Sequence, residues 1–360
     1  MTPTHPPIPV TPDDLSLGWL IAALEFSGSD SMIQPIGMTK TSIGEGLSAS
    51  GVLTRLNLKY ESPQPDAVST LIVKMPMHPS NPNGASVRKQ GTYPREIRFY
   101  RELAAECPLV TPEFYYGRHD PDSGDAVLII EDLASRRPGD NAVGCSDGEA
   151  LEIVGELGKL HAHFWEANDR ADLRWLRGDG ISDLIANIFG PRWSDGRSAM
   201  ADKVSAELFA LGDRYFEDSD LLKWIDEPPV TLFHGDFRLD NMYFSDGDSR
   251  PITFVDFQRI GVGQGVTDFA VFALSALSVD QRRAIENDLL DTYYRRLVGG
   301  GVERYTTDYL WLDYRRSVGF VAIRTLVAML LFTDSASNHN DALLQTTTAV
   351  EDLEAIDALG

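Results

Sequence analysis

Eight consecutive residues, HGDFRLDN at positions 234–241, place a histidine, an arginine, two aspartates and an asparagine between the apolar runs VTLF and MYF. Asp236 and Asn241 are five residues apart, and Asp256 follows fifteen residues later at the end of a further apolar run. Polar side chains between apolar strands carry a desolvation cost unless an ion or hydrogen bonds satisfy them. We therefore expect these three side chains to share a function, although a hairpin turn is the alternative interpretation of the loop.

The spacing of the three side chains is typical of kinase-type phosphoryl transfer, in which an aspartate accepts a hydroxyl proton while an asparagine and a second aspartate hold magnesium. Mg²⁺ prefers a few oxygen ligands together with substrate phosphates, and one amide and one carboxylate provide such a set. The sequence therefore predicts Asp236 as the catalytic base and Asn241 and Asp256 as magnesium ligands.

A glycine- and serine-rich segment, IGEGLSASG, lies between the first two strand-like stretches of the chain. Gly44, Gly46 and Gly51 would allow backbone N–H groups to approach a polyphosphate, and Ser48 and Ser50 would add hydroxyl donors. The segment matches neither the P-loop nor the dinucleotide-binding fingerprint. Taken alone, the segment is also compatible with a flexible hairpin loop. It predicts a nucleotide-binding loop only when other nucleotide-binding residues support that interpretation.

Lys74 lies inside the apolar stretch TLIVKM, where a lysine is unusual. It could face water from an edge strand. Alternatively, it could bind nucleotide phosphates and pair with Glu96, which opens the following helical stretch, YPREIRFY. The helix dipole alone also favours a glutamate at that position. Because both residues follow a glycine loop, we favour the functional pair.

The stretch LIIEDL, at positions 128–133, is an apolar strand that runs into a charged turn. We interpret it as an interlobe hinge whose backbone carbonyl and N–H groups, at Glu131 and Leu133, bind the edge of an adenine. A strand that simply ends in a charged turn is the alternative.

The elements that must position these residues divide the chain in two. Thr11 and Pro12 predict the start of a helix that runs to about Phe26. Three strand-like stretches, a helix over 93–106 and two more strands follow, and connections too short for crossovers predict a mainly antiparallel sheet. The five strands are expected at 33–43, 51–60, 67–75, 113–119 and 126–133.

A polar stretch over 134–148 reads as a linker, and helices dominate beyond it. We expect an α+β chain with a small antiparallel-sheet lobe over 1–133 and a larger, mainly helical lobe over 134–360. The region 168–228 is less regular and contains several tryptophans. Short strands are predicted at 230–233, 242–244 and 252–256, and helices at about 147–165, 266–277, 279–297, 307–333 and 341–358.

Composition limits the possible partners. The chain has 32 basic and 54 acidic residues, and its formal charge of −22 argues against a nucleic-acid-binding surface. The acidity would suit a neutral or cationic substrate, or it would simply maintain solubility. The longest apolar stretch, 318–332, is too short to span a bilayer and contains Arg324, so we expect a buried helix. Two cysteines and no recognisable secretory signal favour a cytoplasmic location.

On these motifs the sequence resembles the aminoglycoside phosphotransferase-like kinases, which have the protein-kinase-like fold. HGDFRLDN is similar to that family's catalytic loop, and VDFQ stands where protein kinases have Asp-Phe-Gly. EDL and the Gly-x-Gly loop followed by serine are most similar to the ecdysteroid-kinase-like and choline-kinase-like branch. The resemblance covers roughly residues 37–280. It implies a bilobal fold and the use of ATP and Mg²⁺.

The resemblance also implies a role for each matching residue. Asp236 would be the base, Asn241 and Asp256 the magnesium ligands, and Lys74 the phosphate-binding lysine that Glu96 anchors.

Further residues would support the loop or depart from the family pattern. His234 would brace the catalytic loop, and Asp268 would support it from the start of the next helix. His161 and His163 lie two apart within a helix and do not share a face, so a metal site is not expected there. The resemblance implies a structural role for that histidine motif.

Arg238 stands where protein kinases carry a lysine that contacts the transferred phosphate. We count it among the catalytic residues, although it could equally pair with Asp240. Phe257 and Gln258 replace Phe-Gly, so regulation by the flip seen in protein kinases is not expected.

The sequence thus predicts an ATP-dependent phosphotransferase that moves the γ-phosphate to a hydroxyl of a small molecule. One alternative is an inactive kinase-fold protein that binds nucleotide as a scaffold, and another is a protein-serine/threonine kinase. Aminoglycosides, choline-like compounds, steroid-like alcohols and other hydroxylated metabolites all stay open as acceptors, as do GTP in place of ATP and the oligomeric state.

Overall fold

The computed structural model describes residues 5–28, 34–43, 51–62, 67–81, 88, 91–177, 181–245, 251–331 and 336–360. The chain forms two compact units, one made of Met1–Arg137 with Ser245–Arg259 and the other of Pro138–Phe244 with Ile260–Gly360. Because the first unit also includes residues 245–259, the division into lobes after residue 133 stays a prediction.

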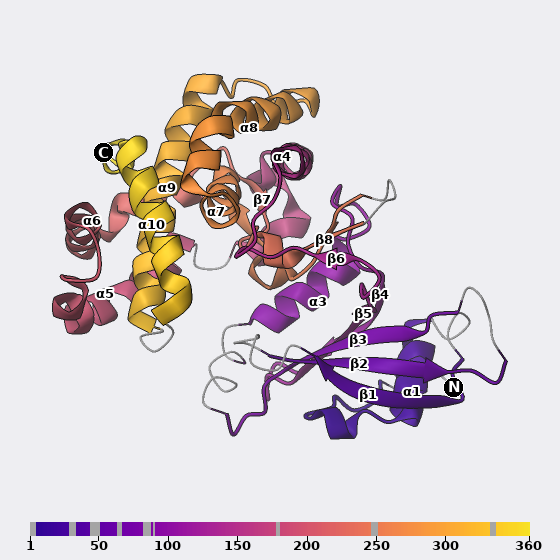
Figure 1. The fold of residues 1–360 in the computed structure, drawn as a ribbon. Helices are drawn as coiled ribbons and strands as arrows, with labels where there is room; N and C mark the ends of the chain where they lie inside the picture. The colour runs from indigo at the N-terminus through magenta and orange to yellow at the C-terminus, as the bar shows by residue number, and fades with distance from the viewer. Residues whose placement is uncertain are drawn as a thin grey trace. The chain divides into compact units, whose positions relative to one another are not determined.

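A five-stranded antiparallel sheet dominates the first unit, in the order β1-β2-β3-β5-β4 (Figure 1). The register pairs Gly37 with Lys59 across β1 and β2, and Leu53 with Lys74 across β2 and β3. The five predicted strands and their antiparallel pairing are confirmed. The strands are β1 (Gly37–Ile43), β2 (Gly51–Lys59), β3 (Thr70–Pro76), β4 (Phe114–His119) and β5 (Ala126–Glu131).

Two helices, α1 (Leu17–Ser27) and α3 (Thr92–Glu102), cover opposite faces of this sheet. Side chains alternate along a strand, so β3 directs Leu71 to one face and Lys74 to the other. Leu71 is fully buried in the apolar cluster that α1 completes, whereas Lys74 meets Glu96 of α3. The sheet therefore separates an apolar core from a face that carries charged groups.

The N-terminal helix begins later than the sequence predicts. Pro12–Asp14 forms a single 3-10 turn, in which the carboxylate of Asp14 accepts a hydrogen bond from the backbone N–H of Thr11 at 2.8 Å. A second cap then starts α1, because the hydroxyl of Ser16 accepts from the N–H of Trp19 at 3.1 Å. Two successive caps thus divide the predicted helix.

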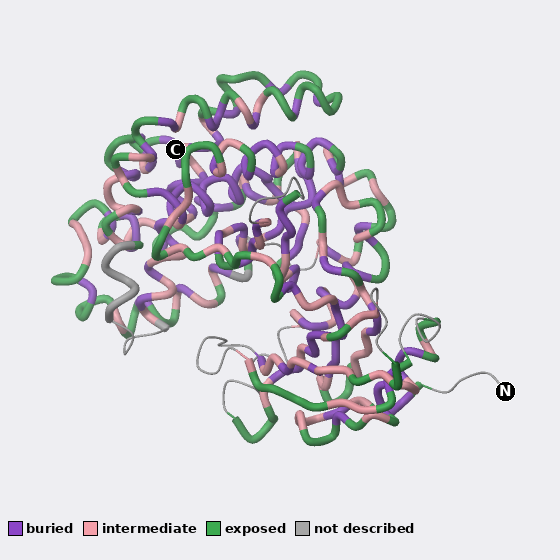
Figure 2. The backbone as a smooth tube through the Cα atoms, turned by 45° about the vertical axis from the view of Figure 1, so that its right-hand side comes forward, coloured by how far each residue is buried: buried purple, intermediate pink, exposed green. Residues whose placement is uncertain are grey.

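The second unit is mainly helical, and Figure 2 shows its buried residues gathered in the interior of the unit with exposed residues on its outer turns. Helix α4 packs on α8, α7 packs on α9, and α10 packs on both α9 and α7. The helices are α4 (Asp147–His163), α5 (Ile181–Met200), α6 (Ala206–Glu217), α7 (Val266–Ala276), α8 (Val279–Gly299), α9 (Thr307–Leu331), α10 (Ala336–Asp352) and α11 (Ala355–Ala358).

Short strands carry the segments that flank the loop HGDFRLDN. β7 (Thr231–Phe233) pairs antiparallel with β10 (Gly261–Gly263). β8 (Met242–Phe244) follows the loop, β9 (Thr253–Phe254) precedes Asp256, and β6 (Arg137–Pro138) lies where the sequence predicts a linker. The predicted strands around the loop are therefore confirmed.

The region 168–228 is more regular than the sequence indicates. It contains α5 and α6, and Pro191 lies inside α5. The fully buried Trp193 joins the two helices, because its indole N–H donates to Asp213 of α6 at 3.0 Å. The periodicity of α5 is obscured in the sequence by that proline and by charged residues on the outer face of the helix.

The apolar stretch 318–332 falls in α9 up to Leu331, and Val318, Ala322 and Leu326 are buried at helical spacing. Among the described residues, none of the helices combines the length and the apolar character needed to span a bilayer. The predicted fold class is confirmed: the chain is α+β, with an antiparallel sheet in the N-terminal unit and a mainly helical remainder.

Candidate active site

Lys74 lies on β3, the central strand of the five-stranded sheet, and its side chain is only 12% exposed. Its ammonium nitrogen, Nζ, lies 2.9 Å from Oε2 of Glu96 and 2.8 Å from Oδ1 of Asp256. The alternative of a solvated lysine on an edge strand is therefore wrong. The first unit brings together three of the predicted site residues around one positive charge.

The pKa values of the pair reflect burial and mutual attraction. Burial lowers the pKa of Lys74, but the carboxylates of Asp256 and Glu96 outweigh it and hold that pKa above its ordinary value. Burial raises the pKa of Glu96 from its ordinary 4.5 to about 7, against the opposing pull of Lys74. The lysine is thus a fixed cation at neutral pH, and Glu96 is the group that titrates there.

Asp256 adopts a left-handed backbone conformation, with φ +66°. Few residues other than glycine adopt this conformation, which costs free energy and is found disproportionately at functional sites. Phe257 anchors the turn, because its ring stacks on Phe99 of α3 with ring centroids 3.8 Å apart. The aromatic contact thus ties the position of Asp256 to the helix that carries Glu96.

Of the predicted nucleotide loop, only the first and last residues, Ile43 and Gly51, are described. Gly44, Gly46, Ser48 and Ser50 lie outside the described residues. At Gly51 an added Cβ would lie 1.8 Å from Oη of Tyr93 and 2.7 Å from the carbonyl oxygen of Met75. Gly51 is therefore required by close packing against β3 and α3, which the sequence did not indicate.

Glu131 ends β5, and Leu133 follows it as a buried residue. Between them, Asp132 forms two hydrogen bonds with Arg55 of β2, at 2.6 and 3.1 Å. The carboxylate of Glu131 accepts from the backbone N–H of Glu113 at 3.2 Å. Both acidic side chains of the EDL motif thus fix the course of the backbone, and the adenine-binding role of Glu131 and Leu133 stays a prediction.

The loop HGDFRLDN follows β7 in the second unit, and a buried aspartate holds its first turn. Asp268, at the start of α7, accepts hydrogen bonds from the N–H groups of His234 at 2.6 Å and Gly235 at 2.9 Å. Nδ1 of His234 accepts from the N–H of Asp236 at 3.3 Å. This chain of contacts orients the backbone at Asp236, as expected for a supporting role of His234 and Asp268.

His161 reinforces this support from α4. Its ring is fully buried, Nδ1 lies 2.7 Å from Oη of Tyr293, and Nε2 lies 3.6 Å from Oδ2 of Asp268. His163 lies on the exposed side of the same helix. The two histidines therefore occupy different faces.

Asn241 is directed at Asp236 from the far end of the loop. Its amide nitrogen, Nδ2, donates to the backbone carbonyl of Asp236 at 2.8 Å and lies 3.4 Å from Oδ2 of the Asp236 carboxylate. Because the amide nitrogen is used in this way, the amide oxygen is the atom available for a metal. The second unit thus brings together the predicted base and one predicted magnesium ligand.

Arg238 and Asp240 lie close to each other, and each of them also contacts another residue. The guanidinium of Arg238 lies 3.6 Å from Oδ2 of Asp236 and 3.6 Å from Oδ2 of Asp240. Asn141 holds Asp240 with its backbone N–H and its side-chain amide, both at 3.0 Å. Its amide oxygen also accepts from the N–H of Leu239 at 3.1 Å. Asp240 is therefore a structural residue of the loop.

The segment around Asn141 was missed as part of the site, because the sequence marks it only as a polar linker. At Gly139 an added Cβ would lie 2.2 Å from the carbonyl oxygen of Leu239. The N–H of Gly139 donates to the carbonyl of Met242 at 2.8 Å. Gly139 and Asn141 thus both pack against the loop HGDFRLDN and hold it in place.

Arg324 of α9 was also missed as a site residue. Its guanidinium lies 3.8 Å from Oδ1 of Asp236, and its side chain is 26% exposed. The signal available in the sequence was a charged residue inside an otherwise apolar stretch.

The predicted metal ligands are of the right chemical kind for magnesium. Asn241 offers an amide oxygen, and the carboxylate of Asp256 can hold Lys74 with one oxygen and a cation with the other. Within the described part of the chain, no three His, Cys, Asp or Glu side chains gather as a metal-binding group. Each of these residues thus offers one oxygen of the kind that Mg²⁺ takes together with phosphates and water.

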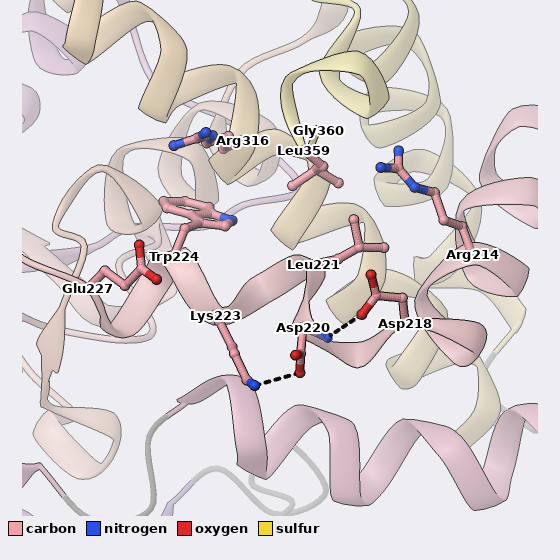
Figure 3. A pocket seen from close by; sticks show the side chains of 10 residues that line it. All are labelled: Arg214, Asp218, Asp220, Leu221, Lys223, Trp224, Glu227, Arg316, Leu359 and Gly360. Atoms are coloured by element: carbon pink, nitrogen blue, oxygen red, sulfur yellow. Dashed lines mark hydrogen bonds and ion pairs between the residues drawn. The ribbon is translucent and has the colours of Figure 1, made fainter.

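A separate pocket of about 280 Å³ in the second unit contains none of the predicted site residues (Figure 3). Its charged side chains are of both signs, and Lys223 pairs with Asp220 at 2.7 Å. It offers no excess charge with which to select a substrate. Its lining residues are Arg214, Asp218, Asp220, Leu221, Lys223, Trp224, Glu227, Arg316, Leu359 and Gly360.

Residues 64–304, more than half of the chain, match the phosphotransferase enzyme family, abbreviated APH. The chain belongs to this family. The match confirms the resemblance to aminoglycoside phosphotransferase-like kinases. It covers Lys74, Glu96 and the whole loop HGDFRLDN.

A curated relative of this phosphotransferase is an uncharacterized kinase-like protein of Caenorhabditis elegans, 22% identical over 247 residues. The match spans 65% of this chain and 65% of that protein, so slightly less than two thirds of the relative's length is covered.

Solved structures of small-molecule kinases share the fold. An ethanolamine kinase of Plasmodium vivax matches with a TM-score of 0.59 and 13% identity, over 92% of this chain and 86% of that one. A choline kinase of Cryptosporidium parvum matches with a TM-score of 0.57 and 12% identity, over 93% and 96%. The amicoumacin kinase hAmiN, in complex with AMP-PNP and Ca²⁺, matches with a TM-score of 0.54 and 13% identity, over 89% of each chain. The phosphotransferase thus has the protein-kinase-like fold of small-molecule kinases.

Proposed function

We propose that this phosphotransferase transfers the γ-phosphate of ATP to a hydroxyl group of a small molecule. The observation that carries the proposal is the buried Lys74, whose ammonium is held by both Glu96 and Asp256. A lysine in an apolar sheet without a polyphosphate to bind would have no evident reason to keep two carboxylates beside it.

Lys74 would bind phosphate oxygens of the nucleotide, and the loop that ends at Gly51 would contact them through backbone N–H groups. The backbone at Glu131 and Leu133 would bind the base. The likeness to an AMP-PNP-bound kinase supports a nucleotide as the phosphate donor.

Asn241 and Asp256 would hold Mg²⁺ through one amide oxygen and one carboxylate oxygen. When bound, the cation neutralises phosphate charge and orients the γ-phosphate. The contact between Nδ2 of Asn241 and the carbonyl of Asp236 keeps the amide oxygen turned away from the base.

Asp236 would accept the proton of the acceptor hydroxyl as the phosphoryl group moves. His234, Asp268 and Asn241 fix the backbone on either side of it, so its carboxylate needs little reorganisation during the reaction. Arg238, 3.6 Å from this carboxylate, would contact the transferred phosphate.

Two other functions remain distinguishable from this one. An inactive scaffold usually loses one of the catalytic residues, whereas Lys74, Glu96, Asp236, Asn241 and Asp256 are all present. A protein kinase would be expected to carry His-Arg-Asp and Asp-Phe-Gly, which are HGD and DFQ here. The two described cysteines are unpaired, which supports a cytoplasmic site of action.

A screen of hydroxylated metabolites, read out by ADP release from ATP with and without Mg²⁺, tests the proposal. We expect magnesium-dependent turnover with at least one small alcohol and none with generic protein substrates. ATP binding without turnover on any acceptor would favour the scaffold, and labelling of proteins alone would favour the protein kinase.

A further inference from the structure

The first turn of α3 carries a buried hydroxyl close to the carboxylate that pairs with Lys74. Tyr93 and Glu96 are three residues apart, lie on the same face of the helix and are both buried. Glu96 pairs with the ammonium of Lys74. The hydroxyl of Tyr93 donates to the backbone carbonyl oxygen of Met75 at 2.9 Å. Helix α3 therefore contacts two consecutive residues of β3.

The same hydroxyl also lies against the first residue of β2. An added Cβ at Gly51 would lie 1.8 Å from Oη of Tyr93, so the hydroxyl occupies the space that any other side chain would need. In the register of the sheet, Gly51 pairs with Pro76, which has no N–H group to donate to the ladder. Tyr93 thus links the two strand ends, through close contact with β2 and through a hydrogen bond to β3.

Burial keeps the hydroxyl of Tyr93 a hydrogen-bond donor. The residue is 2% exposed, and burial raises the pKa of its hydroxyl above the ordinary value of 10, against the opposing effect of Lys74. The hydroxyl therefore keeps its proton at neutral pH. Its bond to the carbonyl of Met75 does not depend on pH in the range of a binding assay.

We propose that Tyr93 is a positioning residue of the nucleotide site, which fixes the end of the proposed nucleotide-binding loop at Gly51 beside the strand that carries Lys74. This inference rests on the proposed kinase function, which assigns that loop and the lysine to the phosphates of ATP. One helix, α3, would thus align both phosphate-binding elements. Loss of the hydroxyl would release the end of the loop and leave the lysine with its carboxylates, so phosphate binding would weaken while binding of the base would not change.

Tyr100 provides a matched control on the same helix. It lies two turns after Tyr93, is also buried, and its hydroxyl has no hydrogen-bond partner among the residues that the structure describes. A buried hydroxyl without a partner costs free energy, so its removal breaks no contact. Tyr100→Phe should therefore leave the nucleotide site unchanged.

Equilibrium binding of Mg²⁺·AMP-PNP and of adenosine to the intact protein, measured by calorimetry, tests the inference without turnover. Tyr93→Phe keeps the ring and removes only the hydroxyl. We expect this variant to bind AMP-PNP about 3- to 10-fold more weakly, as for the loss of one hydrogen bond, and to bind adenosine as the wild type does. Unchanged AMP-PNP binding, or an equal loss for AMP-PNP and adenosine, would overturn the inference.

A double-mutant cycle with Gly51→Ala tests the contact itself. With tyrosine at position 93 the new Cβ would meet Oη at 1.8 Å, whereas with phenylalanine the nearest atom of that ring is Cζ at 3.2 Å. The carbonyl oxygen of Met75 lies 2.7 Å from the new Cβ in both backgrounds, so its cost cancels in the cycle. We expect Gly51→Ala to weaken AMP-PNP binding less in the Tyr93→Phe background than in the wild type. Effects that simply add would contradict the proposed link.

These measurements also separate the inference from the kinase proposal. With an acceptor from the ADP-release screen, the KM for ATP should rise in Tyr93→Phe by the same factor as the AMP-PNP dissociation constant, while the KM for the acceptor stays unchanged. Normal turnover with wild-type AMP-PNP binding in Tyr93→Phe would retain the kinase function and reject the role of Tyr93. The expected loss of AMP-PNP binding without ADP release on any acceptor would retain that role and reject the kinase function. A wild-type protein that does not bind AMP-PNP would overturn both.

Discussion

At the scale of single residues, the site is organised by side chains that each hold two partners. Lys74 holds two carboxylates, Asn241 holds the carbonyl and the carboxylate of Asp236, and Asp268 holds two backbone N–H groups. Truncation of such a side chain removes both of its contacts, and any buried partner is then left without a hydrogen bond. Substitutions at these positions should therefore have large effects.

Glu96 should make stability depend on pH in a way that Glu96→Gln removes. The pKa of Glu96 is about 7 in the folded state and 4.5 ordinarily. Between these pH values the buried carboxyl keeps its proton in the folded state, whereas the unfolded chain loses it. The folded state then binds more protons between these values, so stability falls as pH rises from 4.5 to 7. The expected fall is about 3 kcal/mol, because each pKa unit corresponds to about 1.4 kcal/mol.

Urea unfolding at several pH values between 4.5 and 8 measures this effect. The free energy of unfolding of Glu96→Gln, subtracted from that of the wild type, isolates the contribution of Glu96 from the other carboxyl groups. A difference that is flat, or that rises with pH, would refute the raised pKa.

At the scale of elements, the loop HGDFRLDN is fixed by segments that are distant in the sequence. The segment from Gly139 to Asn141 packs on its outer side, and α7 contributes Asp268. Close backbone approach leaves no room for a side chain at Gly139.

Gly139→Ala should displace the loop, because the new Cβ would lie 2.2 Å from the carbonyl oxygen of Leu239. We expect a loss of about 1–3 kcal/mol in stability, as for overpacked sites, together with reduced turnover. Gly148→Ala is the matched control, since nothing lies within 4 Å of its Cβ in the first turn of α4. That variant should gain about 0.4–1 kcal/mol in stability. Equal thermal stability of the two variants would refute the close packing of Gly139 against Leu239.

Arg282 joins the C-terminal helices through a buried ion-pair network. It is 2% exposed, its guanidinium donates to Glu286 at 2.8 Å, and it also bonds Asp352 of α10. Arg282→Ala leaves the carboxylate of Glu286 without its cation, whereas Asp352 keeps its pair with Arg283. The substitution should cost about 3 kcal/mol of unfolding free energy in urea. Arg295→Ala breaks only an exposed pair with Asp291 and should change stability by less than about 0.5 kcal/mol. A loss at Arg282 no larger than at Arg295 would contradict this account.

At the scale of the whole molecule, the sequence predicts those structural features that follow from local patterns in the chain. The five strands, the antiparallel pairing and the contact of Lys74 with Glu96 follow from periodicity and from a strand that is followed by a helix. The family and its fold follow from the motif HGDFRLDN.

What the sequence did not predict depends on tertiary packing. Asn141 and Arg324 contact the loop HGDFRLDN from the polar stretch 134–148 and from α9, and no local pattern connects them to it. Pro191 obscured α5, and Asp14 and Ser16 provided two caps where one helix start was expected.

The most direct test of the central claim is the turnover of Asp236→Asn with an acceptor identified in the ADP-release screen, measured at saturating ATP and acceptor. We predict a decrease in kcat of about 10²–10⁴-fold, with unchanged affinity for Mg²⁺·ATP, and no decrease in the control Asp288→Asn on an exposed residue of α8. A folded Asp236→Asn protein that binds Mg²⁺·ATP and keeps wild-type turnover would contradict the account.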